Sequence, residues 1–191
     1  TLTVGYYNLQ ANSLPGIRLW LDGNNLDADT TADISHNGEP LADGMAIVQW
    51  NDGSGNTNHT GQATASNRPT HVAGGLNNKG VVNFTASQTM DIAADSTIRT
   101  IAAVIKQAST QNAVAKPFGG NQNLTNSAQN FALGGTDSGI STTSYHVVVW
   151  QFTSGAYSIH IDGKNKGSSS SSLTPAAFDK VGNDFAGSLA E

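Results

Sequence analysis

The chain has 191 residues, of which 37% are hydrophobic and 12% charged, and it contains no cysteine. This length fits one domain covering residues 1–191, and the lack of cysteine excludes disulfides and thiolate metal sites. The formal net charge is −5 and the nine Lys and Arg residues are spread singly, so we expect no nucleic-acid partner. The sequence has no run of about 18 apolar residues, so it predicts no membrane insertion.

Short runs of β-branched and aromatic residues recur along the chain, separated by Gly, Asn, Asp and Pro. Such runs are typical of strands, and their number predicts an all-β fold, a two-sheet antiparallel β-sandwich with at most short helical turns. In chain order, the predicted strands cover residues 3–9, 17–21, 46–50, 80–84, 90–92, 99–106, 131–133, 146–152, 156–161 and 178–181.

Residues 92–108 fit two kinds of structure. Their alanine content, with Asp95 or Ser96 as an N-cap, favours a helix. The alternation of apolar residues within this stretch also suits a strand that is buried on both faces. We expect a short helical turn near Asp95 followed by a strand.

Residues 145–163 contain the clearest hairpin of the chain. Thr153, Ser154 and Gly155 separate two apolar stretches, and Asp162 with Gly163 supplies the turn that follows. Alternation places residues 146, 148, 150 and 152 on one face and residues 147, 149 and 151 on the other. We expect at least one of these faces to belong to the core.

An ordered set of phrases resembles a known family. The phrases are LWLDGNNL at 19–26, WNDGSGN at 50–56 with His59, RPT at 68–70, GVVNF at 80–84, IDGK at 161–164 and FAGSLAE at 185–191. Together they are similar to laminin-G-like domains of the concanavalin A-like lectin/glucanase superfamily. That resemblance implies a jelly-roll β-sandwich. Such domains continue the last phrase into an apolar strand, so we expect either a strand beyond Glu191 or residues 3–9 in its place.

Two acidic loops are candidates for a calcium site. Asp27, Asp29 and Asp33 lie in the first loop, and Asp52 and Asn56 lie in the second. Calcium binds six to eight oxygens from carboxylates, amide carbonyls and the backbone. The alternative is that these side chains cap turns by bonding to nearby backbone, and for Asp52 and His59 this structural role is the favoured one.

Three further loops are rich in amides and bear aspartates, which suits hydrogen bonding to a sugar or a peptide. The predicted ligand contacts in them are Asn121, Asn123, Asp137, Asn183 and Asp184.

The three tryptophans could stack on sugar rings, but all of them lie in strand patterns. Trp20, Trp50 and Trp150 are therefore predicted to belong to the core.

Catalysis is not expected. Sandwich glycosidases use paired carboxylates, whereas this chain has only two glutamates, Glu39 and Glu191, and no strand with alternating acidic residues. The alternative is a polysaccharide hydrolase or lyase that uses Asp27 and Asp29.

The acidic balance and the absence of cysteine are similar to the ligand-binding modules of large bacterial RTX-type adhesins. This resemblance implies a noncatalytic, calcium-dependent module on the cell surface that recognises a host peptide or glycan through its rim loops. The module would be a monomeric unit within a longer extracellular chain. A ligand-free spacer domain is the remaining alternative.

Overall fold

The computed structural model describes residues 14–28, 35–36, 39–108, 116, 118, 124–125, 130–133, 136–153, 156–169 and 177–190. Within these residues the chain is all-β, with one short 3-10 helix at Ala65–Asn67, and every strand pair is antiparallel. The prediction of an all-β antiparallel sandwich is confirmed. No helix among the described residues is long and apolar enough to cross a membrane.

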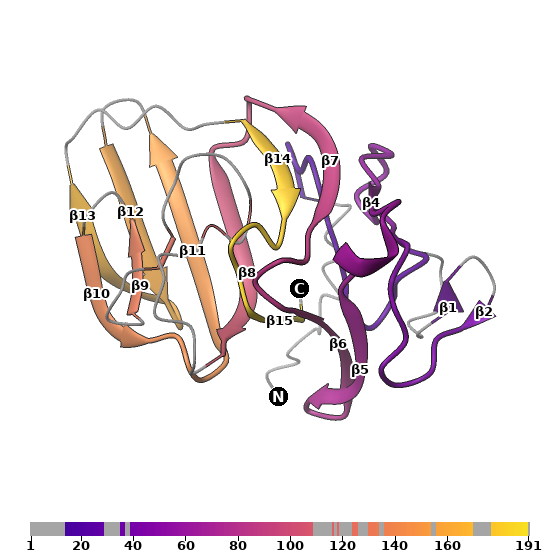
Figure 1. The fold of residues 1–191 in the computed structure, drawn as a ribbon. Coiled ribbons are helices and arrows are strands. Elements are labelled where there is room, and N and C mark those ends of the chain that lie inside the picture. The colour runs from indigo at the N-terminus through magenta and orange to yellow at the C-terminus, as the bar shows by residue number, and fades with distance from the viewer. Residues whose placement is uncertain are drawn as a thin grey trace, which may run out of the picture.

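The larger sheet has seven strands in the order β13-β12-β11-β8-β15-β6-β5 (Figure 1). Their bounds are β5 Thr70–Leu76, β6 Lys79–Phe84, β8 Thr100–Gln107, β11 His146–Thr153, β12 Ala156–Ile161, β13 Lys164–Ser169 and β15 Gly187–Leu189. The strand β15 is the shortest of the seven and lies between β8 and β6, near the middle of the sheet.

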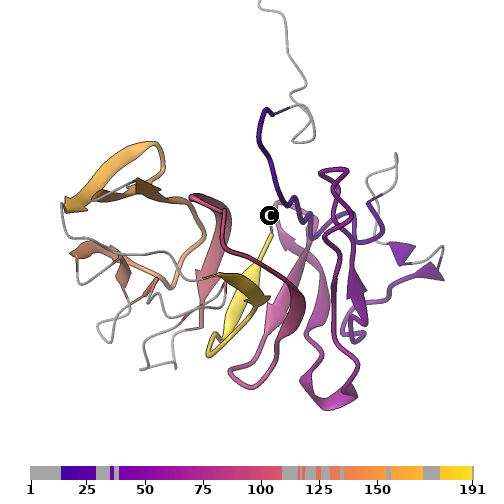
Figure 2. The ribbon, with the colours of Figure 1, turned by 90° about the horizontal axis from the view of Figure 1, so that it is seen from above.

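The second layer consists of smaller sheets. Four strands follow the order β14-β7-β4-β3, with bounds β14 Phe178–Val181, β7 Met90–Asp95, β4 Thr60–Gly61 and β3 Gln49–Trp50. The hairpin of β9 Asn130–Leu133 and β10 Thr136–Ser141 contacts β12 and β13. A separate pair joins β1 Ser35–His36 to β2 Glu39–Pro40, at the opposite end of the molecule from β13 (Figures 1 and 2).

The core draws on strands of both layers, because one face of each strand turns inward. In β11, Val148, Trp150 and Phe152 are buried, whereas residues 147, 149 and 151 are half-buried or exposed. The predicted alternation of this hairpin is confirmed. Trp50 of β3 and Phe131 of β9 join the same cluster from the second layer. Burial of such aromatic side chains is the main favourable contribution to folding.

Most predicted strands that lie within the described residues form, with ends that shift by a few residues. The exceptions are residues 46–50, of which only Gln49–Trp50 is a strand, and residues 17–21, which pair with a loop and are not part of a regular ladder. The predicted strand 3–9 lies outside the described residues.

The expected helical turn near Asp95 is wrong. The strand β7 continues to Asp95, and a hydrogen-bonded turn leads directly into β8. Asp95 still caps that turn, because its Oδ1 accepts the backbone N–H of Thr97 at 2.7 Å. The strand alternative for the rest of this stretch is confirmed.

Three long strands were not predicted, because their sequences lack the expected signal. The strand β13 is polar and lies at the sheet edge, and β10 carries Asp137 and Gly139. The strand β5 contains Gly74 and Gly75, which break the apolar pattern. A Cβ on Gly75 would lie 2.4 Å from Val81 Cγ2, so the close approach of β6 requires glycine there.

Candidate functional site

The carboxylate of Asp52 organises the loop that follows β3. Its Oδ1 accepts the backbone N–H of Trp20 at 2.9 Å and of Ser54 at 2.9 Å. Its Oδ2 accepts the Ser54 hydroxyl at 2.8 Å and the Asn58 N–H at 3.0 Å. Asp52 is only 5% exposed, and its own N–H donates to His59 Nδ1 at 3.0 Å. These four accepted bonds match the acceptor capacity of a carboxylate, so Asp52 anchors the fold.

The same loop holds residues 17–20 in place. Asn56 Nδ2 donates to the carbonyl of Ile17 at 2.8 Å, and Asn58 Nδ2 donates to the carbonyl of Arg18 at 2.7 Å. The N–H of Gly53 donates to the Trp20 carbonyl at 2.8 Å. One side of residues 17–20 is therefore bonded to the loop.

The structure brings the two predicted calcium loops side by side. Asn51 donates its N–H to Leu26 O and its Nδ2 to Asp27 O, both at 2.9 Å. Asp29 and Asp33 lie outside the described residues. Among the residues that are described, no group of three or more His, Cys, Asp or Glu is arranged to hold a metal. Calcium at these loops stays a prediction.

The predicted ligand contacts lie on separate elements. Asp137 lies in β10, exposed, where its Oδ1 accepts the N–H of Gly139 at 2.8 Å. Asn183 and Asp184 lie in the turn between β14 and β15, away from β10 in both Figure 1 and Figure 2. Asn121 and Asn123 lie outside the described residues. The described members of this set therefore do not form one cluster.

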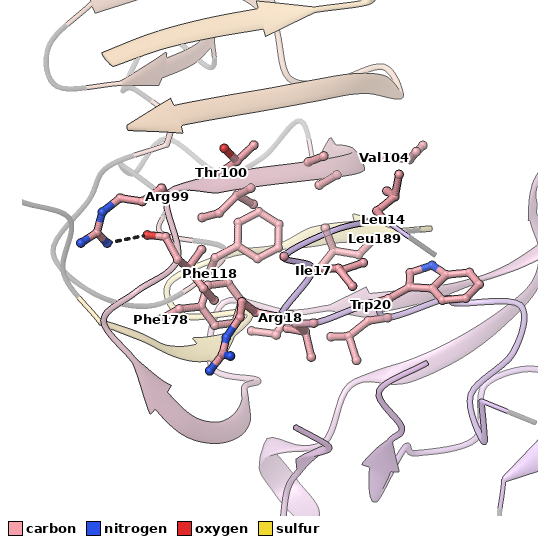
Figure 3. A pocket seen from close by; sticks show the side chains of 18 of the residues that line it. Leu14, Ile17, Arg18, Trp20, Arg99, Thr100, Val104, Phe118, Phe178 and Leu189 are labelled. Carbon is pink, nitrogen blue, oxygen red and sulfur yellow. Dashed lines mark hydrogen bonds between the residues drawn. The ribbon is translucent and has the colours of Figure 1, made fainter. Parts of the chain in front are cut away.

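An apolar pocket of about 680 Å³ lies between β8 and residues 14–21. Figure 3 shows the side chains of both segments around it, together with those of Phe118 and Phe178. Aliphatic and aromatic side chains make up most of its walls: Leu14, Ile17, Leu19, Trp20, Leu21, Trp50, Ile98, Ile101, Val104, Phe118, Val147, Phe178, Val181 and Leu189. Concave apolar sites of this size are typical of ligand-binding pockets.

Aromatic rings form one wall of the pocket. The Phe118 ring stacks on Phe178 with a centroid distance of 5.8 Å and meets Trp150 edge-on at 5.8 Å. Trp150 is fully buried, and its Nε1 donates to the Ala132 carbonyl at 3.2 Å. This wall is therefore fixed by the core of the sandwich.

Two arginines line the pocket. Arg18 Nε donates to Asp95 Oδ2 at 3.0 Å, and Arg99 bonds the carbonyls of Ser96 and Ile98. Hydrogen bonds from Thr97 chiefly, with help from Arg18, hold the pKa of Asp95 below its usual range. Arg18 is thus paired with a carboxylate, and Arg99 is bonded to backbone carbonyls.

The tryptophan prediction holds for two of three residues. Trp50 and Trp150 are buried in the core, as predicted. Trp20 is only half-buried: it lines the pocket and packs its ring against Gly53, where a Cβ would lie 2.9 Å from the ring. Trp50 Nε1 donates to the Asp22 carbonyl at 3.0 Å, which ties β3 to the segment after Trp20.

The pocket was not predicted from the sequence, although both segments that border it were predicted as strands. The available signal was the apolar character of β8 on both faces, which a strand between two full layers would also show.

Comparison with protein-family models, curated proteins and solved structures found no match for this chain.

Proposed function

We propose that the chain is a noncatalytic recognition module of an extracellular surface adhesin, and that it binds an extended apolar peptide of a host or neighbouring cell. The observation that carries this proposal is the pocket between β8 and residues 14–21. Its walls are mainly aliphatic and aromatic, which favours apolar peptide side chains over the hydroxyl groups of a glycan.

Calcium has a supporting role in this proposal. The loops of Asp27 and Asp52 lie side by side, and the Asp52 loop holds residues 17–20 at the pocket. Calcium bound by the loop of Asp27 would make both loops more rigid. Peptide binding would then require a smaller loss of conformational entropy.

A peptide array and a glycan array, each probed with and without EDTA, test this function. We expect peptides with alternating apolar residues to bind, glycans not to bind, and EDTA to weaken peptide binding. Binding confined to glycans would overturn the ligand class, and peptide binding unchanged by EDTA would overturn the role of calcium.

A variant that fills the pocket supplies the structural control. Ile101 lines the pocket from β8 and is half-buried, so Ile101→Trp should occupy part of the space and lower peptide affinity at least tenfold. Val149→Trp on the outer face of the neighbouring strand β11 does not line the pocket and should leave affinity unchanged. Equal binding by both variants would place the peptide elsewhere.

A further inference from the structure

We propose that Met45 is a modification site, at which a peroxide oxidises the thioether chiefly to one sulfoxide epimer. The N–H of Ala42 bonds to one side of the sulfur and leaves the other side open to the oxidant. This inference goes beyond the proposed function and does not depend on the pocket. It rests on the exposure of Met45, on the hydrogen bond to its sulfur and on the anchored backbone around it.

The chain has two methionines, and their surroundings differ sharply. Met45 is 48% exposed, whereas Met90 on β7 is fully buried in the core. The sulfur of Met90 also lies against the Thr60 hydroxyl, at 3.7 Å. Because an oxidant must reach the sulfur, susceptibility to oxidation follows exposure. The folded chain therefore offers a peroxide Met45 first, and Met90 serves as an internal reference.

The sulfur of Met45 has a partner on one side. Its Sδ accepts the backbone N–H of Ala42 at 3.3 Å. A thioether sulfur is a weak hydrogen-bond acceptor with two lone pairs, and this bond uses one of them. The second lone pair points away from the N–H donor. Since nearly half of the side chain is exposed, we infer that the oxidant reaches the sulfur through this second lone pair.

The backbone of Met45 is held on both of its polar groups. Its C=O accepts the N–H of His71 at 2.9 Å, and its N–H donates to the Ala42 carbonyl at 3.2 Å. The neighbouring Gly44 donates its N–H to the His71 carbonyl at 2.8 Å. His71 is fully buried on β5, so these bonds fix the turn to the sandwich. The side chain therefore starts from a fixed point, and the sulfur presents the same side to solvent.

The oxidation is a two-electron transfer of oxygen from hydrogen peroxide to sulfur. The sulfur lone pair attacks one peroxide oxygen, so that an S–O bond forms while the O–O bond breaks. Hydroxide leaves and takes the proton of the transferred oxygen, which yields methionine sulfoxide and water. The sulfoxide is chiral at sulfur. Attack through one lone pair gives one epimer, whereas a freely rotating methionine gives both in similar amounts.

The modified residue would lie on the segment that covers the outer edge of β5, the last strand of the seven-stranded sheet. Next to Met45, Ala46 forms a bridge with Thr70, and Ile47 donates its N–H to the Pro69 carbonyl at 2.8 Å. Oxidation turns an apolar side chain into a polar one. At Met45 the new oxygen meets solvent rather than the core, so the oxidised chain should stay folded.

Peptide mapping after peroxide treatment tests the site. The full chain is oxidised with hydrogen peroxide, once folded and once in concentrated urea, and is then digested with trypsin. Cleavage after Arg18, Lys79 and Arg99 separates the two methionines, since Met45 falls in residues 19–79 and Met90 in residues 80–99. Mass spectrometry then gives each oxidation rate. In the folded chain Met45 should react about tenfold faster than Met90, or more, whereas the two rates in urea should be similar.

Two reductases distinguish the epimers. Methionine sulfoxide reductases A and B each reduce one of the two, and they are added separately to the digested peptides. Because the peptides are unfolded, the result reports the epimer rather than access to the sulfur. For Met45 oxidised in the folded chain, one enzyme should remove most of the sulfoxide and the other little. For the sample oxidised in urea, each enzyme should remove about half.

Ala42→Pro tests the hydrogen bond itself, because proline removes the N–H and keeps the C=O that accepts from Met45. This variant should lose the epimer preference, whereas Ala42→Val, which adds similar bulk and keeps the N–H, should retain it. If Ala42→Pro does not fold, the comparison of the folded and urea samples decides. Similar oxidation rates of Met45 and Met90 in the folded chain would overturn the site. Equal repair by the two reductases, or a preference that persists in Ala42→Pro, would overturn the role of the Ala42 N–H.

Discussion

The backbone N–H of Trp20 donates to Asp52 Oδ1 at 2.9 Å, across 32 positions of sequence. This bond joins the loop after β3 to the segment that forms one border of the pocket. Because Asp52 also holds Ser54 and Asn58, the position of Trp20 depends on the whole loop. The shape of the pocket is therefore linked to a carboxylate that does not line it.

Asp52→Ala should lower the free energy of unfolding by about 3 kcal/mol, since it leaves three half-buried backbone N–H groups without their acceptor. Urea unfolding followed by tryptophan fluorescence measures this change. Asp91→Ala is the matched control, because its 2.7 Å pair with Lys180 lies at the surface and should be worth less than about 1 kcal/mol. Equal losses in the two variants would refute the anchoring role of Asp52.

Gly182→Ala should destabilise the turn between β14 and β15 by about 3 kcal/mol or more. Gly182 has φ 97°, and a Cβ there would lie 2.4 Å from Phe84 Cδ1 in the core. Gly163→Ala is the control, because Gly163 has φ 77° but no heavy atom within 4 Å of its Cβ position. Gly163→Ala should lower the free energy of unfolding by about 1 kcal/mol, through backbone strain alone. Thermal unfolding compares the two, and a similar loss in both would show that the core contact is unimportant.

Acid should destabilise the chain through His71. The side chain is fully buried on β5, and this burial lowers its pKa, outweighing the Ala42 backbone and Asp43, which both raise it. The unfolded chain takes up a proton near pH 6.5, whereas the folded chain resists it until lower pH. The contribution of the neutral His71 to the free energy of unfolding is therefore fully present above pH 6.5. It is lost as the pH falls from 6.5 toward the lower pKa of His71 in the folded chain.

Urea unfolding at pH 7.5 and pH 5.0 measures this fall, and His71→Met should reduce it. The pKa values of Asp162 and Asp95 are lowered, chiefly by hydrogen bonds from His146 and Thr97 respectively, so both stay ionised in this range. An unchanged pH dependence in His71→Met would exclude this histidine as the cause.

Calcium should raise the melting temperature if the loop of Asp27 holds it. At a calcium concentration about 100 times Kd, binding to the folded state alone adds about 2.7 kcal/mol of stability. Asp27→Asn should reduce the shift, EDTA should reverse it, and Asp137→Asn on the distant strand β10 should leave it intact. No calcium-dependent shift in the parent chain would rule out this site.

The strands with a strong alternation of apolar residues could be predicted from the sequence, whereas the pocket could not. The alternation in β11 separated the two faces of that strand, and the structure shows that the face with Trp150 is the buried one. The pocket depends on how Asp52 holds residues 17–20 beside β8, which is a long-range relationship. Local periodicity also could not distinguish Asp52 as an anchor from Asp52 as a metal ligand, since a carboxylate suits both roles.

Peptide titration into the parent chain and into Ile101→Trp tests the central claim most directly. A peptide with alternating apolar residues should bind the parent chain, and it should bind Ile101→Trp at least tenfold more weakly, because the new ring would occupy part of the pocket. Thermal unfolding of both proteins shows that the variant is folded. Equal affinity of the parent chain and Ile101→Trp for the peptide would contradict recognition at this pocket.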